Sequence, residues 1–486
     1  MQMAAGPAMF LPPAPSLAGI EAGAETKLAD AERLRRLPTG GQSIAGVEDM
    51  AAFKPAVCLA IKVIAKGGRI GHIAVVPGQR LRGLAGFRRH IGMGHAMSDK
   101  SASISGQLQT DLLIIGGGIM GLWAAMQAER RGIRTLLVDG GPFAGGASGG
   151  LLGALMPHMP DKWNEKKQLQ FDALLSLEGE IAALEADTGL SAGYRRSGRL
   201  IPLPKPHLRA IAERHSGEAL SNWHQGDDQF FWNVLESSPC GAGWPADEFS
   251  AGGLVLDTFA ARVSPRGLTR MIAERLRKTK CVRVVEGCGV ERIDVASGTA
   301  TLGDGSTIAF GHTVIAAGHQ SFPLLSSFGP KLEKPLGQPV KGQAALLRAD
   351  VSPDLPLLYL DGLYIVPHEG GQVAIGSTSE NCFGEPYSTD GLLDDLLARA
   401  CQLAPMLGGA EVIERWAGLR PKAVDRDPMV GVHPDADRVV ALTGGFKVSF
   451  GLAHVLADAA LDAVEGKAMS LPESFSLAHH LRVAAG

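Results

Sequence analysis

The chain has 486 residues, of which 20% are charged and 45% are hydrophobic, so it can bury a large core and is not disordered overall. Its formal net charge of -3 gives no reason to expect nucleic acid as a bulk partner. At roughly 150 residues per domain, we expect about two or three domains.

The cysteines and the apolar segments indicate the cellular compartment of the protein. The six cysteines are scattered, without a Cys-x-x-Cys pair or a zinc-like cluster, which fits a reducing compartment. The sequence contains no run of 18 apolar residues, so it predicts no transmembrane helix. The apolar N-terminus also lacks the basic region of a signal peptide. We therefore expect a cytoplasmic protein.

Residues 1–96 differ in composition from the rest of the chain. They are rich in Ala, Gly, Pro and Arg, and between residues 51 and 96 they carry many basic side chains and no acidic one. Met97 then begins the sequence Met-Ser-Asp-Lys, a plausible start of the native protein. We interpret residues 1–109 as a disordered or non-native extension. A basic targeting or partner-binding arm is the alternative.

The first regular elements form a strand–turn–helix–strand unit. Residues 111–115 are a short apolar strand, and Gly-Gly-Gly-Ile-Met-Gly at residues 116–121 is a turn. A helix over residues 122–131 and a second strand over residues 134–138 follow. The second strand ends at Asp139.

This unit predicts a dinucleotide site. Gly116 allows the tight turn, Gly118 lets the backbone approach a pyrophosphate, and Gly121 lets the helix pack on the strand. The helix N-terminus offers free N–H groups and a positive dipole end to phosphates. Asp139, about 20 residues on, is placed to accept hydrogen bonds from a ribose.

The rest of the chain alternates short strands with a few helices. We expect helices over residues 164–186, 265–278, 392–400 and 451–464. We expect strands over residues 194–203, 231–237, 282–286, 290–294, 299–302, 307–309, 314–318, 340–348, 363–367 and 372–376.

Two later segments favour FAD over a nicotinamide dinucleotide. Residues 145–150 (Gly-Gly-Ala-Ser-Gly-Gly) follow the second strand closely, where an FAD enzyme threads a loop along its cofactor. Residues 314–318 resemble the second flavoprotein fingerprint, a strand that places Gly318 near the cofactor. A simple nicotinamide dehydrogenase needs neither segment.

The predicted fold class is α/β, with a Rossmann-like FAD-binding domain interleaved with a mixed-sheet α+β substrate domain. We expect the FAD-binding domain to comprise residues 110–190, 263–335 and 416–486. We expect the substrate domain to comprise residues 191–262 and 336–415.

With these features identified, the chain resembles the D-amino-acid oxidase superfamily of FAD-dependent oxidoreductases, in its glycine oxidase and sarcosine oxidase branch. The resemblance covers about residues 110–465, and its most specific motifs occur late in the chain. They lie at residues 339–343, 364–367, 375–378, 416–421, 427–431 and 443–447.

The resemblance implies oxidation of a small amino acid, such as glycine, sarcosine or a D-amino acid, by hydride transfer to flavin. The imine product hydrolyses to an oxo acid plus amine, and no catalytic side chain is required beyond the flavin. Arg420 would pair with the substrate carboxylate, and the Tyr364 hydroxyl would reach the same group. Lys447 would contact substrate or flavin, or would activate oxygen.

The resemblance also implies a set of flavin contacts. Besides the glycines named above and Asp139, they are Ile119, Met120, Gly149, Gly150, Leu151, Val290, Gly445, Phe446, Lys447, Val448, Ser449, Phe450 and Gly451. No cysteine falls in residues 402–486 and no histidine directly follows the loop at residues 145–150, so we expect non-covalent FAD and no metal.

Several alternatives stay open from the sequence. The electron acceptor could be oxygen or a quinone, and a homo-oligomer is compatible with the sequence. The run Gly-Ala-Leu-Met-Pro at residues 153–157 also resembles a flavin domain that acts on a carboxymethylaminomethyl-modified transfer RNA, although no basic cluster is evident in the catalytic region. A flavin-binding subunit of a multi-subunit dehydrogenase is the third alternative.

Deletion of residues 1–96 should leave a folded protein that binds flavin, because the dinucleotide unit lies wholly beyond Met97. The measurement is the yield of soluble protein and its visible flavin absorbance. Loss of soluble, yellow protein on truncation would show that the segment packs on the core.

Overall fold

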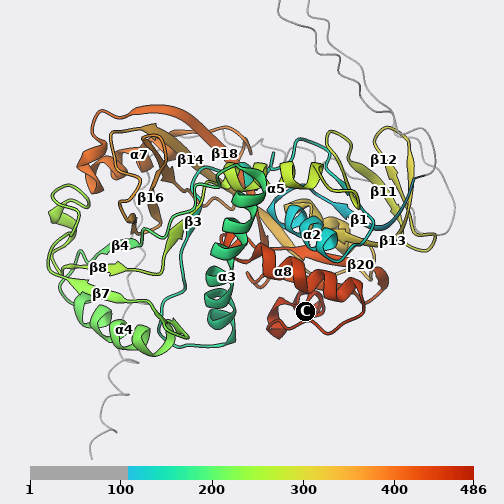
Figure 1. Ribbon diagram of the computed structural model, residues 1–486, viewed down its shortest axis with the longest axis horizontal. Helices are drawn as coiled ribbons and strands as arrows, with labels where there is room; N and C mark the ends of the chain where they lie inside the picture. Colours follow the sequence, from blue (N-terminus) through green and yellow to red (C-terminus); the bar gives the residue numbers. More distant parts are fainter. Residues whose placement is uncertain (1–107) are drawn as a thin grey trace, which may run out of the picture. The chain divides into compact units, whose positions relative to one another are not determined.

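The computed structural model describes residues 108–486, which contain two eight-stranded sheets (Figure 1). The predictions made for residues 1–96 and for nearly all of the extension to residue 109 therefore lie outside the described residues. The α/β fold class is confirmed, as both sheets are packed with helices.

The first sheet is built around parallel strands. Its order is β10-β2-β1-β13-β12-β11, with β20 beside β13 and β19 beside β20, and neighbours among β10, β2, β1, β13 and β20 are parallel. The strands are β1 (Leu108–Ile115), β2 (Thr135–Val138), β10 (Val282–Val285), β11 (Val290–Asp294), β12 (Thr299–Leu302), β13 (Thr307–Ile315), β19 (Met429–His433) and β20 (Ala436–Thr443).

Strand β1 is apolar on both faces because this sheet is covered on both sides. Leu112 and Ile114 pack with helices α2 (Ile119–Arg130), α3 (Glu165–Thr188), α5 (Pro265–Arg277) and α8 (Ser449–Val464). Leu113 and Ile115 pack in a second core with residues of α6 (Ser321–Ser326) and α9 (Leu477–Ala485). Alternate side chains of one strand thus serve two separate cores.

The second sheet has the order β18-β14-β17-β16-β15-β4-β8-β7. Its strands are β4 (Arg199–Pro202), β7 (Trp232–Leu235), β8 (Leu254–Asp257), β14 (Gly337–Arg348), β15 (Leu357–Leu360), β16 (Leu363–His368), β17 (Gln372–Gly376) and β18 (Glu411–Ala423). Helix α7 (Gly391–Leu403) covers one face, where Ile365 and Ile375 are buried. Tyr364 and Val366 lie on the opposite face, in a cluster with Leu151.

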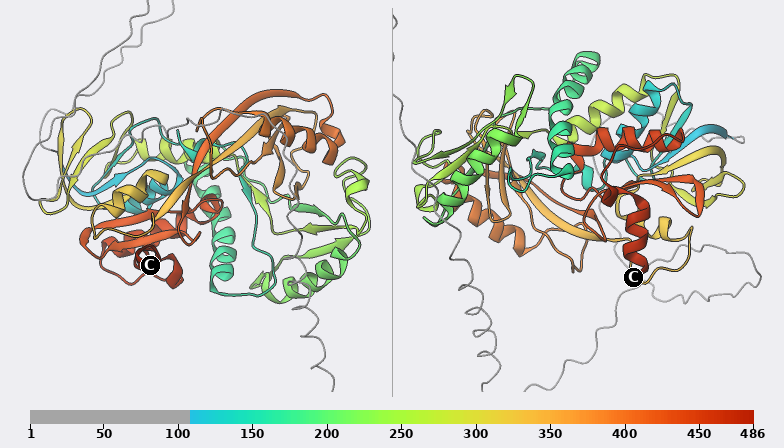
Figure 2. Two further views of the ribbon diagram at one scale, coloured as in Figure 1. Left: turned by 180° about the vertical axis from the view of Figure 1, so that it is seen from behind. Right: turned by 90° about the horizontal axis from the view of Figure 1, so that it is seen from below.

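The core continues from one sheet to the other. Ile201, Trp232 and Val255 of the second sheet belong to the same apolar cluster as α3 and α8. Helix α3 lies between the two sheets in all three ribbon views (Figures 1 and 2). The remaining elements are β3 (Ala154–Leu155), β5 (His224–Gln225), β6 (Asp228–Gln229), β9 (Ala261–Arg262), α4 (Leu208–Asn222) and short 3-10 turns.

Some predicted elements differ from the observed ones. Residues 307–309 and 314–318 are not two strands, because β13 runs unbroken from Thr307 to Ile315 and ends before Gly318. The strand continues through Gly311, where a Cβ would lie 2.7 Å from the carbonyl oxygen of Asp111 in β1. The sequence also gave no signal for α4 or β18. The proposed domain boundary at residues 415/416 falls inside β18, which pairs with β14 along its length.

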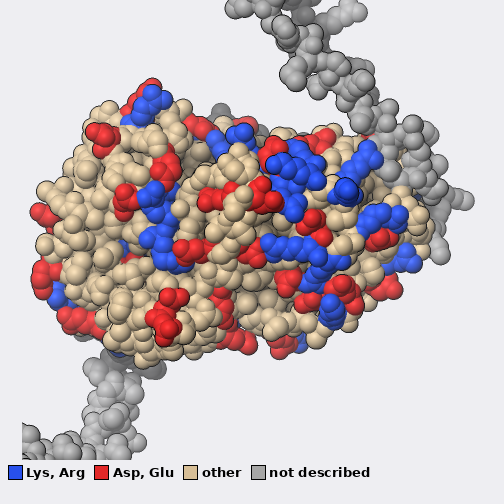
Figure 3. All heavy atoms as spheres, viewed as in Figure 1, with Lys and Arg blue, Asp and Glu red and all other residues tan. Residues whose placement is uncertain are grey.

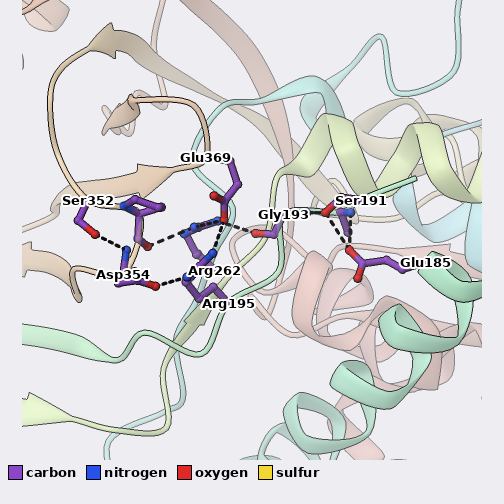
Figure 4. A network of polar contacts seen from close by, with 10 residues as sticks. Glu185, Ser191, Gly193, Arg195, Arg262, Ser352, Asp354 and Glu369 are labelled. Carbon is purple, nitrogen blue, oxygen red and sulfur yellow. Dashed lines mark hydrogen bonds and ion pairs between the residues drawn. The ribbon is translucent and has the colours of Figure 1, made fainter. Parts of the chain in front are cut away.

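An ionic network surrounds one buried arginine, Arg262 (Figure 4). The fully buried Arg262 of β9 donates to Gly193 O at 2.6 Å and to Glu369 Oε1 at 2.9 Å. Arg195 also donates to Glu369 at 2.9 Å and pairs with Asp354. The hydrogen bond from Arg262 lowers the pKa of Glu369. The network ties β9 to the turn after β16. Because each charge in it is paired, no buried ion is left isolated.

Three properties concern the described part of the chain only. No helix among residues 108–486 is long and apolar enough to cross a membrane. Within the same residues, no three His, Cys, Asp or Glu side chains are grouped to hold a metal ion, and the cysteines there are free. On the face drawn in Figure 3, acidic and basic side chains are interspersed.

His454 should make the fold acid-labile. Its Nε2 lies 2.9 Å from Ser176 Oγ, and burial lowers its pKa from 6.5 to about 4. A lowered folded-state pKa contributes stability that is present above pH 6.5 and is lost as the pH falls toward 4. The loss from this group should be roughly 2 to 3 kcal/mol between about pH 7 and about pH 4.5.

The measurement is the urea unfolding midpoint of His454→Gln and wild type at both pH values. The variant should show the smaller acid-induced shift, whereas the exposed control His224→Gln should follow wild type. Parallel pH profiles for His454→Gln and wild type would contradict this account.

Candidate active site

The predicted cofactor residues gather at one edge of the first sheet. Strands β10, β2, β1, β13 and β20 are parallel, so their carboxyl ends share this edge. Gly116, Asp139, Gly318, Gly445 and the segment before Val290 follow those ends. Ligands of open α/β sheets bind outside the carboxyl ends of the strands.

The glycine turn between β1 and α2 leaves no room for side chains. A Cβ on Gly121 would lie 1.8 Å from the Gly116 carbonyl oxygen, so only glycine lets the helix approach the strand. Gly116 has a φ of +110°, a conformation that favours glycine. Gly118 precedes Ile119, whose N–H begins α2 and donates to Ser148 Oγ at 2.9 Å. Ser148 thus fastens the second glycine loop to the first.

Asp139 is held in place by the backbone around it. Its carboxylate accepts hydrogen bonds from Gly117 N at 2.6 Å and from Gly141 N at 2.8 Å. A carboxylate has further acceptor capacity, which suits a ribose hydroxyl. The chain before Val290 approaches the same place, since a Cβ on Gly140 would lie 3.4 Å from the Cα of Gly289.

The loop around residues 149–151 contacts helix α5 and the second sheet. Gly149 ends a short 3-10 turn, and its carbonyl oxygen accepts a hydrogen bond from Arg266 Nε at 2.8 Å. A Cβ on Gly150 would lie 3.3 Å from the ring of Trp416 in β18. Leu151 packs in the cluster that includes Tyr364 and Trp416.

The segment from Gly445 to Gly451 closes the same edge. Thr443, at the end of β20, donates its hydroxyl to Gly318 O at 2.9 Å. A Cβ on Gly445 would lie 2.6 Å from Met120 Cε, so this loop packs on the start of α2. Phe446 has a φ of +43° and Lys447 is exposed. Val448 then precedes α8, which begins with Ser449, Phe450 and Gly451.

These residues fit a dinucleotide. Three glycine segments bring the backbone to one place where added Cβ atoms would collide, and Asp139 and the start of α2 face the same edge. Close backbone approach, helix N–H groups and a fixed carboxylate are the features by which a Rossmann-type domain holds a pyrophosphate and a ribose.

Arg420 lies on the other side of the site, in β18. Its Nη1 donates to Ser377 Oγ at 2.9 Å, and its Nη2 donates to Thr378 O at 2.5 Å. Burial lowers its pKa, and among residues 108–486 it forms no ion pair with a carboxylate. Its buried Nε has no hydrogen-bond partner there. The charge of Glu380 acts on Arg420 from beyond ion-pair distance and raises its pKa by less than burial lowers it. A fixed and largely desolvated guanidinium with no carboxylate in contact is suited to an anionic ligand.

Tyr364 and Lys447 lie near Arg420 without bonding to it. The Tyr364 ring packs 4.9 Å from that of Tyr359, and burial raises its pKa, opposed by the charges of Arg199 and Arg420. Arg420 Cζ and Lys447 Nζ lie 5.5 Å and 5.7 Å from the centre of the Phe446 ring. Desolvation, with a smaller effect from Arg420, lowers the pKa of Lys447.

Sequence reasoning missed residues that fasten this site. Ser148 lies inside the predicted loop, but nothing in the sequence shows that it receives the Ile119 N–H. Ser377 holds Arg420, and His368 Nε2 lies 3.0 Å from Leu152 O, each across a long sequence separation. The sequence offered one indication that Arg266 has a special role. It is a basic residue in the first turn of a helix, where acidic residues are favoured.

Comparisons with known proteins agree on one family. The family model "FAD dependent oxidoreductase" (DAO) matches residues 111–459. The glycine oxidase of Bacillus licheniformis is 26% identical over 366 residues, which cover 73% of this chain and 93% of that protein.

Solved structures show the same fold. The glycine oxidase of Geobacillus kaustophilus has a TM-score of 0.67 and 23% identity, covering 76% of this chain and 99% of that one. An iminodiacetate oxidase from a Chelativorans species has a TM-score of 0.65 and 21% identity, covering 75% and 98%.

Asp139→Ala should weaken FAD binding by roughly 1.5–3 kcal/mol, the scale of a hydrogen bond to a charged group. The variant loses the two bonds from Gly117 N and Gly141 N and, if our assignment is right, the acceptor for a ribose hydroxyl. The measurement is titration of apoprotein with FAD. The control Asp111→Asn changes an exposed acid paired with Arg134 and should bind FAD as wild type does. Equal FAD affinity for Asp139→Ala and the control would remove Asp139 from the site.

Proposed function

The chain belongs to the FAD dependent oxidoreductase (DAO) family, and on that premise we propose that it oxidises a small amino acid. Glycine, sarcosine and D-amino acids are the candidate substrates, and the product is an imine that hydrolyses to an oxo acid plus amine. The relatives' names, glycine oxidase and iminodiacetate oxidase, support an amine that bears a carboxylate.

Arg420 is the observation that carries this proposal. Its guanidinium is held by Ser377 and Thr378, is largely buried, and pairs with no acid among the described residues. Such a charge is costly unless a ligand compensates it. A substrate carboxylate matches the guanidinium fork in two parallel hydrogen bonds, whereas a simple amine would leave the buried positive charge without a partner.

The protein residues bind and orient in this reaction. When bound, FAD supplies the acceptor for the hydride that leaves the amine-bearing carbon. Asp139 and the glycine turn would hold the nucleotide at the edge of the first sheet. Arg420 and the Tyr364 hydroxyl would fix the carboxylate and so orient the carbon to be oxidised. We assign no side chain as a general base.

Oxygen and a quinone are both compatible electron acceptors, and Lys447 is our candidate for a charge beside the flavin. Oxygen consumption measured with a reducing amino acid separates an oxidase from a dehydrogenase. We expect the FAD to be bound without a covalent link, so that acid precipitation releases it into the supernatant.

Arg420→Leu should leave FAD bound but slow flavin reduction by amino acids. Loss of the carboxylate partner costs on the order of 2–5 kcal/mol, which is roughly 30-fold to several-thousand-fold in kcat/KM. Arg420→Lys should recover only part of the rate, because a point charge cannot form the bidentate pair. The measurement is anaerobic stopped-flow reduction.

The matched control is Arg415→Leu, on the same strand, where the arginine pairs with Asp394 of α7. It should reduce at the wild-type rate. If Arg420→Leu is reduced by glycine, sarcosine and D-alanine as fast as this control, the carboxylate assignment is wrong.

A further inference from the structure

The glycine loop, residues 149–152, lies at the end of the second glycine segment and accepts hydrogen bonds at two of its carbonyl oxygens. Gly149 O accepts from Arg266 Nε at 2.8 Å, and His368 Nε2 lies 3.0 Å from Leu152 O. A carbonyl oxygen only accepts, so Nε2 of His368 carries the hydrogen. Between these two points lie Gly150 and Leu151, which contact Trp416 and the cluster of Tyr364.

Arg266 uses all three of its nitrogens to join three segments of the chain. Besides Nε on Gly149 O, its Nη1 and Nη2 donate to the two carboxylate oxygens of Glu414 at 2.8 Å and 2.6 Å. Helix α5, the glycine loop and strand β18 therefore meet at one guanidinium. A bidentate pair fixes the orientation of the guanidinium, which a single ion pair does not.

The position of Arg266 is unfavourable for its own helix. It follows Pro265 in the first turn of α5, where the helix dipole disfavours a positive charge. The other basic residues near a terminus of this helix, Arg275 and Arg277, lie in its last turn, where the dipole favours them. Stability of α5 does not explain Arg266, whereas its contacts to Gly149 and Glu414 do.

Two of the residues that hold the loop, Glu414 and His368, each share a strand with a proposed substrate anchor. Glu414 lies on β18, the strand of Arg420, and His368 lies on β16, the strand of Tyr364. Tyr364 and His368 are four positions apart on β16, so they point to the same face of the sheet. A displacement of either strand would therefore move the loop together with the anchor.

We propose that Arg266, Glu414 and His368 are positioning residues that fix the glycine loop, and so the flavin, at a set distance from Arg420 and Tyr364. The substrate part of this inference rests on the proposed function. The loop-holding part does not, because it concerns FAD binding alone.

The first test measures FAD affinity by titrating apoprotein. Arg266→Met keeps the aliphatic stem and removes the three donors. It should raise the Kd for FAD by about fivefold to thirtyfold, the range for losing a partly exposed charged hydrogen bond. The control Arg415→Met breaks the exposed pair with Asp394, next to Glu414 on the same strand, and should leave the Kd unchanged. An equal Kd for both variants would overturn the proposal.

A charge swap separates loop holding from simple ion pairing. The double variant Arg266→Glu with Glu414→Arg can restore the ion pair and the apoprotein melting temperature, but glutamate cannot donate to Gly149 O. We expect the melting temperature to recover and the FAD affinity to stay low. Recovery of both would show that the ion pair alone matters, and the positioning role would be wrong.

The last measurement is the rate of anaerobic flavin reduction at saturating FAD and amino acid. Arg266→Met should lower the limiting rate constant about tenfold, with little change in the substrate concentration at half-saturation, since Arg420 is untouched. An unchanged limiting rate constant would contradict the distance-setting role. If no amino acid reduces even the wild-type flavin, the proposed function fails, while the FAD affinities still decide whether Arg266 holds the loop.

Discussion

Close approach of backbone segments at the carboxyl ends of five parallel strands is the constraint on which this structure depends. Gly116, Gly121 and Gly445 have no space for a side chain, since added Cβ atoms would meet Ala316 O, Gly116 O and Met120. Polar groups at this edge include backbone N–H groups at the start of α2, the Asp139 carboxylate and the Ser148 hydroxyl. This chemistry suits a phosphate and a ribose better than an apolar ligand.

The second sheet adds a different constraint, which is electrostatic. Arg420 is held by neutral oxygens and is largely withdrawn from water, without an acid partner among residues 108–486. The structural arginine Arg262, by contrast, is fully buried and pairs with Glu369. The protein can therefore neutralise a buried guanidinium, and we propose that at Arg420 a ligand carboxylate takes that role.

The sequence predicted the parts of the site that follow from local spacing. The glycine turn and Asp139 could be identified because strand, turn, helix and acid occur in order within about 30 residues. Arg420 was identified from a motif resemblance, and the sequence could not show that no carboxylate forms an ion pair with it among residues 108–486. Strand β18 was missed because its pairing with β14 is set by distant residues. The bond from Arg266 to Gly149 O spans 117 residues, and no local pattern encodes it.

The claim that joins both sheets is that one site binds FAD on one side and a substrate carboxylate on the other. The most direct measurement is anaerobic bleaching of the holoenzyme flavin by matched pairs of compounds, glycine with methylamine and sarcosine with dimethylamine. The account predicts bleaching by at least one amino acid and none, at equal concentration, by its partner that lacks the carboxylate. Equal bleaching by both members of each pair, or bleaching by the amines alone, would contradict it.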